Sequence, residues 1–392
     1  MKLTYNHTMK CCFLAYITSA IINNILPLLF LTLQKDFGIS ISQLGFVVSC
    51  NFGVQMVVDF LGAKYADKLG YRSTIIAGLS ISAIGLCALA TLPFVMEPYI
   101  GLLCSVCIYA IGSGIIEVIV SPLAEALPSD NKEAAMSLLH SFYCWGHLFC
   151  ILFSTGYFVI FGVKNWRYLI YMWAIIPFIT ALLFTKMPIC TLQSHNGKNE
   201  SVLSLFKQKS FILFFLIMIC SGAAEQAMAQ WVSYFAEEGL GVSKTLGDLL
   251  GTSLFALCMG IARVFYSKKA ERLDLGKYLI FCSALCVISF VGAAMLKNPL
   301  LALMCCGVCG ISTGIMWPGT LSLASQKSPK KSTAMFAMLA VGGDIGCTIG
   351  PEAVATGSSF LNIHGSAIKG GLFCAIIFPI LLAWCVNKIA KQ

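Results

Sequence analysis

Long apolar segments separated by short polar stretches run through the whole chain. Each of these segments has at least 20 residues. An α-helix rises 1.5 Å per residue, so about 20 apolar residues cross the hydrocarbon core of a bilayer. The pattern therefore predicts an all-α membrane protein with twelve transmembrane helices, at 11–33, 43–65, 73–94, 98–123, 135–161, 166–185, 210–235, 246–267, 277–296, 299–324, 333–357 and 369–388.

The longest polar interval, 186–209, lies at the middle of this series. It includes the run Gln193 to Glu200 and leaves six apolar segments on either side. A polar stretch rich in Asn, Ser and Gly between periodic segments is typical of a linker. We therefore expect an N-terminal six-helix bundle at 1–185, a cytoplasmic linker at 186–209 and a C-terminal six-helix bundle at 210–392.

Composition supports a lipid-facing exterior. Only 11% of the 392 residues are charged and 58% are hydrophobic, whereas about 25% are charged in an average soluble domain. Most of the 19 cysteines lie inside apolar segments without disulfide or metal-binding spacing, where Cys behaves as a small hydrophobic residue. We expect no metal and no cofactor.

Basic residues are unevenly distributed between alternate loops. With a cytoplasmic N-terminus, 20 of the 26 Lys and Arg residues fall on the cytoplasmic side. This bias predicts a multi-pass protein of the cell inner membrane with both termini in the cytoplasm. The net charge of +9 then reflects contact with anionic lipid and not with nucleic acid.

The two halves of the chain share features at an offset of about 200 residues. Gly114-Ile-Ile-Glu117 corresponds to Gly314-Ile-Met-Trp317, and Ala135-Met136 corresponds to Ala334-Met335. Two six-helix pseudo-repeats in the same orientation are typical of transporters that bind solute between the repeats.

Between the second and third predicted helices the chain reads Gly62-Ala-Lys-Tyr-Ala-Asp67-Lys68-Leu-Gly70-Tyr-Arg72. This run resembles the loop signature of the major facilitator superfamily. The resemblance implies the major facilitator fold and a gating role for the loop. The residues expected to act in gating are Asp59, Gly62, Asp67, Lys68, Gly70, Arg72 and, from the second half, Arg263.

A narrower resemblance lies in the fourth and fifth predicted helices. Gly112-Ser-Gly-Ile-Ile-Glu117-Val-Ile-Val-Ser121-Pro122, followed by Leu138-Leu-His140-Ser-Phe-Tyr, looks like the fucose permease-like branch. Ser121 stands where that branch usually has Asn. The resemblance implies proton- or cation-linked movement of sugars or similar small molecules.

Ionisable residues inside spanning helices cost a few kcal/mol by insertion scales, so each needs a partner or a function. Glu117 and His140 fall at similar depth on consecutive predicted helices, and His exchanges a proton near neutral pH. We expect the proton-coupling residues to be Glu117, His140, Glu225 and Asp344.

Amide and aromatic residues also occur at related depths in several predicted helices. Indole faces and amide groups suit a sugar-like solute, which has an apolar C–H face and hydroxyl groups at its edge. Helix packing and interhelical hydrogen bonds are the competing interpretation for these residues. The expected substrate-binding residues are Asn23, Asn51, Gln55, Trp145, Gln226, Gln230, Trp231 and Trp317.

Three functions are compatible with these patterns to different degrees. The leading hypothesis is a proton-coupled symporter of a sugar or a similar small neutral polar solute, acting by alternating access. The alternative is an efflux pump for drugs or metabolites on the same fold. A membrane-embedded enzyme or receptor is disfavoured, because no nucleotide loop, metal cluster or nucleophile motif is present. The expected partners are the solute, protons or Na⁺, and the bilayer, with the protein acting as a monomer.

Overall fold

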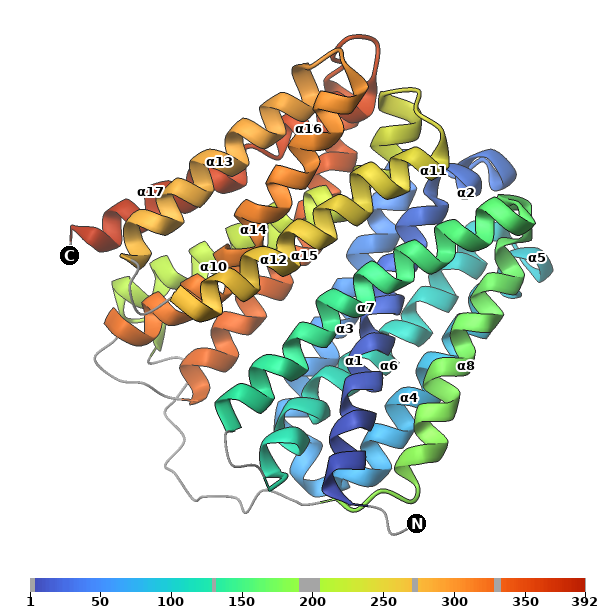
Figure 1. The fold of residues 1–392 in the computed structure, drawn as a ribbon, viewed down its shortest axis with the longest axis vertical. Coiled ribbons are helices and arrows are strands. Elements are labelled where there is room, and N and C mark those ends of the chain that lie inside the picture. The colour runs from blue at the N-terminus through green and yellow to red at the C-terminus, as the bar shows by residue number, and fades with distance from the viewer. Residues whose placement is uncertain (1–3, 129–131, 190–204, 270–273, 328–332, 392) are drawn as a thin grey trace. The chain divides into compact units, whose positions relative to one another are not determined.

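The chain is helical in every part where a spanning helix is expected (Figure 1). The computed structural model describes residues 4–128, 132–189, 205–269, 274–327 and 333–391. Within these residues the only β-structure is an isolated bridge between Ile363 and Ser366. The predicted all-α architecture is confirmed.

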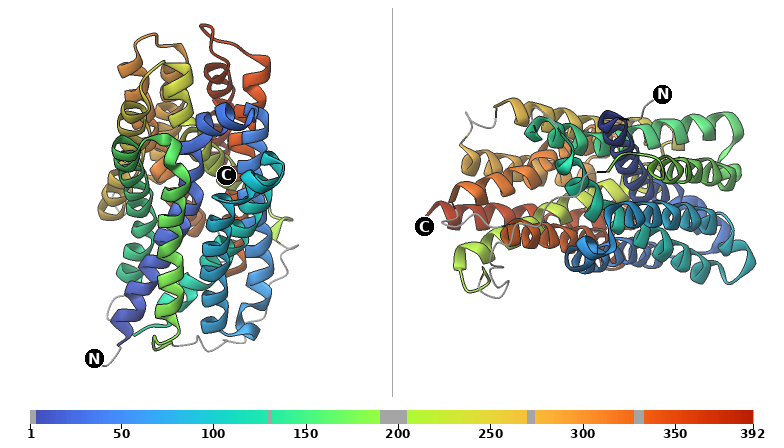
Figure 2. Two further views of the ribbon diagram at one scale, coloured as in Figure 1. Left: turned by 90° about the vertical axis from the view of Figure 1, so that its right-hand side faces the viewer. Right: turned by 90° about the horizontal axis from the view of Figure 1, so that it is seen from below.

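The helices form two compact units, comprising residues 1–39 with 50–195 and residues 40–49 with 196–392. In the first unit, α4 packs against α6 and α8, and α1 packs against α7 (Figure 2). Helix α3 contributes its first turns to the second unit and the rest to the first. The elements are α1 (Tyr5–Ile25), η1 (Leu26–Leu29), α2 (Phe30–Phe37), α3 (Ile41–Leu69), α4 (Tyr71–Leu89), α5 (Leu92–Val95), α6 (Pro98–Ala126), α7 (Lys132–Phe161), η2 (Val163–Asn165) and α8 (Trp166–Phe184).

In the second unit, α10 packs against α15 and α17, and α14 packs against α12 and α13. Of two short stretches of wider, π-helical turns, η3 ends the seventh span and η4 lies within the eighth. The elements are α10 (Lys209–Tyr234), η3 (Phe235–Gly239), α11 (Lys244–Gly247), η4 (Asp248–Ser253), α12 (Leu254–Lys269), α13 (Leu275–Met295), α14 (Pro299–Lys327), α15 (Thr333–Phe360), α16 (Ala367–Cys374) and α17 (Ile377–Ala390).

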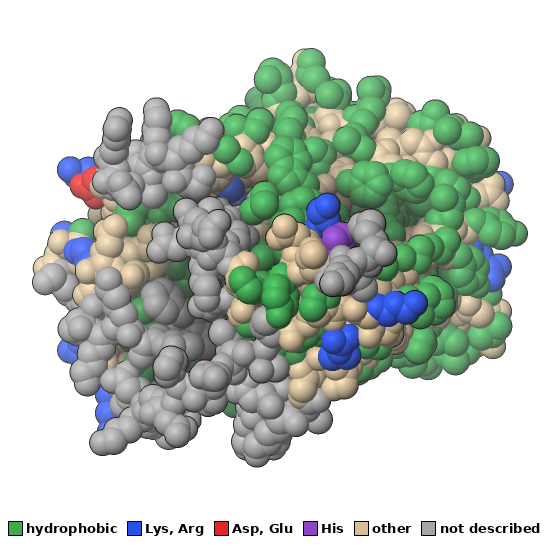
Figure 3. All heavy atoms as spheres, turned by 60° about the horizontal axis from the view of Figure 1, so that its bottom comes forward, with side chains coloured by type: hydrophobic (Ala, Val, Ile, Leu, Met, Phe, Trp, Pro, Cys, Tyr) green, Lys and Arg blue, Asp and Glu red, His purple; other side chains and the backbone are tan. Residues whose placement is uncertain are grey.

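Eleven helical stretches of the described chain are long and apolar enough to span a membrane. The remaining predicted span, 333–357, forms the 28-residue helix α15, whose apolar character is reduced by Asp344 and Glu352. Large apolar side chains point outward, such as Phe60, Ile160 and Phe360, which are 62%, 74% and 85% exposed. Hydrophobic side chains also dominate much of the described surface seen in Figure 3. Lipid is therefore the solvent for these helix faces.

The structure corrects several predicted helix ends. The second helix does not stop at residue 65 but continues to Leu69, so Gly62, Asp67 and Lys68 belong to α3 and not to a loop. The chain breaks only at Gly70, whose φ of 78° suits a residue without a Cβ atom. Polar residues continue a helix beyond the apolar span as long as no breaker intervenes. The last span, predicted as 369–388, is divided between α16 and α17.

Small residues allow close packing between α4 and α6. A Cβ atom added to Gly112 would collide with Ser82 and with the Gly78 carbonyl group. In lipid, close backbone approach at small residues is a main source of helix association. The Gly-rich run of α6 therefore positions the helix that carries Glu117.

Candidate functional site

Three buried amide side chains form a hydrogen-bonded cluster in the first unit. Asn23 Oδ1 on α1 accepts hydrogen bonds from Asn51 Nδ2 at 3.0 Å and from Gln55 Nε2 at 2.9 Å, both on α3. Asn23 Nδ2 donates to the Tyr143 hydroxyl group on α7 at 3.3 Å. Asn51 Oδ1 is buried and has no hydrogen-bond partner among the described residues. The cluster joins three helices and retains an acceptor for a further donor.

A second polar group surrounds Tyr16 on α1. The Tyr16 hydroxyl group lies 2.9 Å from Ser121 Oγ on α6, and the Tyr16 ring contacts the His140 ring edge-on, with centroids 5.3 Å apart. Glu117, one turn before Ser121, is half-buried and lies within electrostatic range of the Tyr16 hydroxyl group. Tyr16 therefore connects the helices that carry the two predicted proton carriers, Glu117 and His140.

An ion pair occupies the core of the second unit. Arg263 Nη2 on α12 lies 3.2 Å from Glu225 Oε2 on α10. Arg263 Nε also donates to the Gly314 carbonyl group on α14 at 3.3 Å. Glu225 is 7% exposed. The positive charge of Arg263, a predicted gating residue, thus compensates the negative charge of Glu225, a predicted coupling residue.

Asp344, the remaining predicted coupling residue, lies half-buried on α15. Its backbone carbonyl group accepts a hydrogen bond from Thr348 Oγ1 at 2.9 Å. Its carboxylate has no hydrogen-bond or ion-pair partner within the described residues. Unlike Glu225, it is an acid that the surrounding helices leave uncompensated.

The polar and aromatic residues predicted on α10 and α14 have well-defined neighbours. Gln230 Nε2 donates to Gln226 Oε1 at 2.9 Å, one turn away on α10. The Trp231 indole is fully buried and donates from Nε1 to the Pro351 carbonyl group of α15 at 3.0 Å. The Trp317 indole lies directly against Gly343, where no Cβ atom would fit beside it. Both indoles thus pack helices of the second unit together, and their role in binding solute stays a prediction.

Asp59, predicted to act in gating, and Trp145, predicted to bind solute, lie on α3 and α7, two of the helices that form the amide cluster. Asp59 is half-buried on α3, one turn beyond Gln55. Trp145 is 47% exposed on α7, one residue beyond Cys144 and two beyond the Tyr143 that contacts Asn23. Neither assignment changes, and both stay predictions.

The loop signature divides into a described and an undescribed part. Gly62, Asp67 and Lys68 lie on α3, and the surroundings of the Asp67 and Lys68 side chains are not among the features that the structure describes. The Arg72 guanidinium group donates to the Phe184, Thr185 and Met187 carbonyl groups at 2.7–2.9 Å. A cation at the C-terminus of a helix satisfies its free carbonyl groups and its dipole. Arg72 therefore stabilises the end of α8, and its role in gating stays a prediction.

Sequence reasoning did not identify Tyr16 and Tyr143. Tyr16 precedes Asn23 by seven residues, which is two helical turns, so both occupy one face of α1. That spacing was visible in the sequence and could have indicated Tyr16. Tyr143 was part of the quoted fifth-helix motif, but its contact with Asn23 depends on how α1 and α7 pack.

The chemistry of these groups is hydrogen bonding and proton exchange. Amides, hydroxyl groups and an imidazole bind hydroxylated solutes, while carboxyl groups and imidazole exchange protons. No group of three or more His, Cys, Asp or Glu side chains among the described residues is placed to hold a metal ion.

Solved transporter structures share the architecture. A bacterial homolog of the human lysosomal transporter Spinster, in an inward-facing and occupied conformation, superposes with a TM-score of 0.82 at 12% identity, covering 100% of this chain and 98% of that chain. A mutant of the nucleoside transporter NupG gives 0.81 at 12% identity over 97% and 98%. A variant of the Escherichia coli fucose:proton symporter gives 0.65 at 18% identity over 99% and 100%. These similarities confirm the predicted twelve-helix fold.

Sequence comparison identifies the family. The L-fucose-proton symporter of Escherichia coli (strain K12) is 21% identical over 402 residues, covering 92% of this chain and 89% of the symporter. That distant similarity agrees with the resemblance in α6 and α7. The model of the Major Facilitator Superfamily matches residues 11–351. The chain therefore belongs to the major facilitator superfamily and is a multi-pass secondary transporter, not an enzyme.

Proposed function

We propose that this transporter carries a sugar or a similar small neutral polar solute together with protons, by alternating access. The observation that carries the proposal is the buried amide cluster of Asn23, Asn51 and Gln55. Buried amides in a lipid-embedded bundle need hydrogen-bond partners, and a hydroxylated solute supplies both donors and acceptors. The unsatisfied Asn51 Oδ1 is the atom best placed to accept a solute hydroxyl group.

The proton-coupling part of the proposal rests on Glu117, His140 and the Tyr16 that lies between their helices. Asp344 is a second candidate because its carboxylate is uncompensated, whereas Glu225 is held by Arg263. The similar symporter from Escherichia coli is named for its coupling of L-fucose to protons. The proposal transfers that mode of coupling to this chain but does not specify which sugar.

The test of solute binding uses purified protein, a thermal-shift screen against sugars, nucleosides, amino acids and cationic dyes, and uptake of the hits into proteoliposomes. We expect neutral hydroxylated compounds to stabilise the protein, because a ligand raises stability by mass action. Dyes stabilising the protein in place of sugars would favour efflux and contradict the proposal.

A substitution in the amide cluster tests directly whether these residues bind the solute. Asn51→Leu removes one donor and the free acceptor but leaves the Gln55 hydrogen bond to Asn23. We expect solute affinity to fall by about 1–3 kcal/mol, roughly 5- to 150-fold, since a solute group loses its partner. Asn24→Leu is the matched control, because the Asn24 amide donates only to the Ala20 carbonyl group of its own helix among the described residues. Equal affinities in both variants would remove Asn51 from the binding site.

We further propose that the two six-helix halves, 1–185 and 210–392, rock about the solute, with the linker 186–209 and both termini in the cytoplasm. Gating is assigned to Asp59, Gly62, Asp67, Lys68, Gly70, Arg72 and Arg263. The Lys and Arg distribution supports the orientation, and the membrane is proposed to be the cell inner membrane.

Cysteine labelling in intact cells tests this orientation. Lys35 and Lys186 are both exposed but fall on opposite sides of the predicted topology. In a background whose reactive native cysteines are replaced, we expect an impermeant maleimide to label Lys35→Cys and to spare Lys186→Cys until the cells are permeabilised. The reverse pattern would invert the topology.

A further inference from the structure

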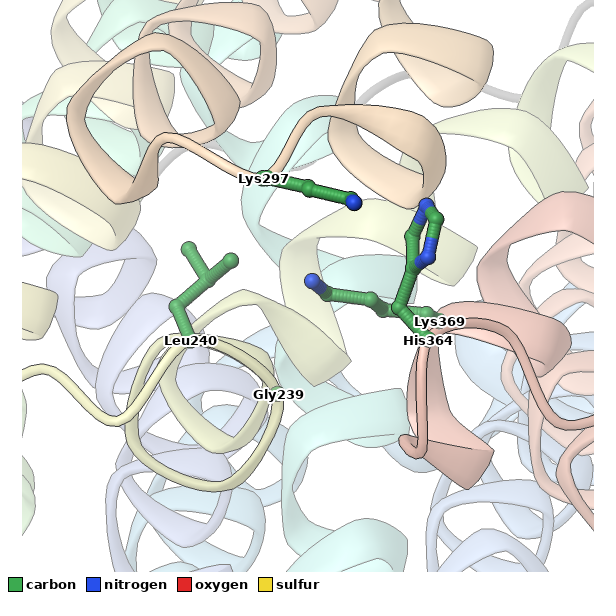
Figure 4. A pocket seen from close by; sticks show the side chains of 5 residues that line it. All are labelled: Gly239, Leu240, Lys297, His364 and Lys369. Atoms are coloured by element: carbon green, nitrogen blue, oxygen red, sulfur yellow. The ribbon is translucent and has the colours of Figure 1, made fainter.

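Three basic side chains line one pocket of the second unit, away from the polar clusters described above. The pocket has a volume of about 450 Å³ and is lined by Gly239, Leu240, Lys297, His364 and Lys369. Figure 4 shows the Lys297 and Lys369 amino groups pointing into the same space, with the His364 ring beside them. Gly239 and Leu240 lie at the end of η3, Lys297 lies in the connection before α14, and His364 lies in the connection before α16. Lys369 lies in α16 itself.

Lys369 is the unusual member of this group. It is only 5% exposed, and its amino group has no hydrogen-bond or ion-pair partner among the residues that the structure describes. Lys is almost never this deeply buried unless it is paired. No acidic residue lines the pocket, and the nearby Glu237 is engaged by Lys244 at 3.4 Å. The pocket lining therefore gathers positive charge without an acidic side chain among its own residues.

The local fold holds the three basic groups in place. Backbone hydrogen bonds in both directions between Ile363 and Ser366 close a tight turn, in which His364 has a φ of 52° and Gly365 a φ of 80°. Ser366 is the N-cap of α16, and Lys369 occupies its first turn. A non-glycine residue in the left-handed region is uncommon and costs free energy. The turn thus holds His364 in the pocket lining, next to the buried Lys369.

Lys297, like Lys369, lies next to the N-terminus of a helix. It directly precedes Asn298, whose Oδ1 accepts from the Leu300 and Leu301 amide groups at the start of α14. Helix N-termini carry partial positive charge. The starts of α14 and α16 thus add to the positive potential of the two lysines, which makes the pocket more attractive to an anion.

We propose that this pocket binds a terminal phosphate group, either as inorganic phosphate or as a phosphate monoester. Two ammonium groups and an imidazole line this pocket, and the two ammonium groups point into the same space. A phosphate monoester presents three acceptor oxygens and up to two negative charges, whereas a carboxylate presents two oxygens and one charge. Lysine is an established phosphate ligand in proteins. The group belongs either to free phosphate or to a lipid headgroup, because the pocket lies at the end of the span Ala367–Ala390.

The experiment measures binding to purified full-length protein with two probes. Inorganic phosphate is titrated against chloride at constant ionic strength, and phosphatidic acid is compared with phosphatidylcholine in nanodiscs, with the melting temperature as the readout. We expect saturable stabilisation by at least one probe. Stabilisation by phosphate identifies a free anion as the ligand, and stabilisation by phosphatidic acid alone identifies a lipid headgroup.

Two variants decide whether the pocket is the site. Lys369→Met removes the buried charge at similar length, and Lys297→Gln removes a charge from an exposed residue whose loss does not threaten folding. We expect each to weaken the response about ten-fold or more, since each removes a charge-assisted hydrogen bond. Lys164→Gln is the control, because Lys164 is a lysine of the first unit, far from the pocket in sequence. No response to either probe, or a response to the probe that Lys297→Gln leaves unchanged, would overturn the proposal.

Discussion

Replacing Glu117 with Gln is expected to uncouple transport from the proton gradient while leaving solute exchange intact. The amide mimics the protonated acid, which we propose must form before the loaded carrier reorients. If one proton moves with each solute, one pH unit is worth about 1.4 kcal/mol and supports about ten-fold accumulation. Glu117→Gln should show no gradient-driven accumulation in proteoliposomes, yet retain counterflow at equal pH.

The position of Glu117 gives this prediction its control. Glu97 lies at the other end of the same helix, where its carboxylate accepts from the Ile100 amide group at 2.6 Å and caps α6. Glu97→Gln makes the same chemical change outside the Tyr16 group, and accumulation should stay at the wild-type level. Gradient-driven accumulation by Glu117→Gln equal to that of the wild type would exclude Glu117 and direct attention to Asp344.

The predicted helices and the depth of their polar residues followed from the sequence because lipid imposes a simple rule. Every spanning segment needs about 20 apolar residues with its backbone groups satisfied internally. Asn23, Asn51 and Gln55 were grouped by counting along such helices, and in the structure Asn51 and Gln55 both donate to Asn23. The depth of a residue along a spanning helix depends only on its position in the chain, so it can be predicted from the sequence.

Side-chain contacts between helices could not be predicted from the sequence, because they depend on which helix faces pack together. Tyr16 and Ser121 are separated by 105 residues, and helices that are apolar all round give little periodicity to orient them. Arg263 was predicted to act in gating because it aligns loosely with Asp59 of the first half. Its long side chain reaches Glu225, a contact that residue counting alone cannot reveal, and its role in gating stays a prediction. The η3 and η4 turns likewise have no sequence signal that distinguishes them from regular helix.

The Glu225–Arg263 pair leads to the largest expected effect on stability. Arg263→Met should lower the free energy of unfolding by about 1–3 kcal/mol, because it leaves a buried carboxylate without its cation. A fully buried pair would cost about 3–5 kcal/mol when broken, but the Arg263 side chain is 29% exposed and solvent screens part of the interaction. The measurement is the melting temperature in detergent, which should fall by several degrees.

A double variant separates loss of the pair from loss of packing. Glu225→Gln combined with Arg263→Met removes both charges, so it should recover most of the stability that Arg263→Met alone loses, as seen when buried ion pairs are replaced by neutral residues. Lys277→Met is the matched control, because Lys277 forms a 3.2 Å ion pair with Asp274 while 87% exposed, and exposed pairs contribute little. If the double variant melts no higher than Arg263→Met, the Arg263 side chain contributes through packing and its contact with Gly314, and not through the charge of Glu225.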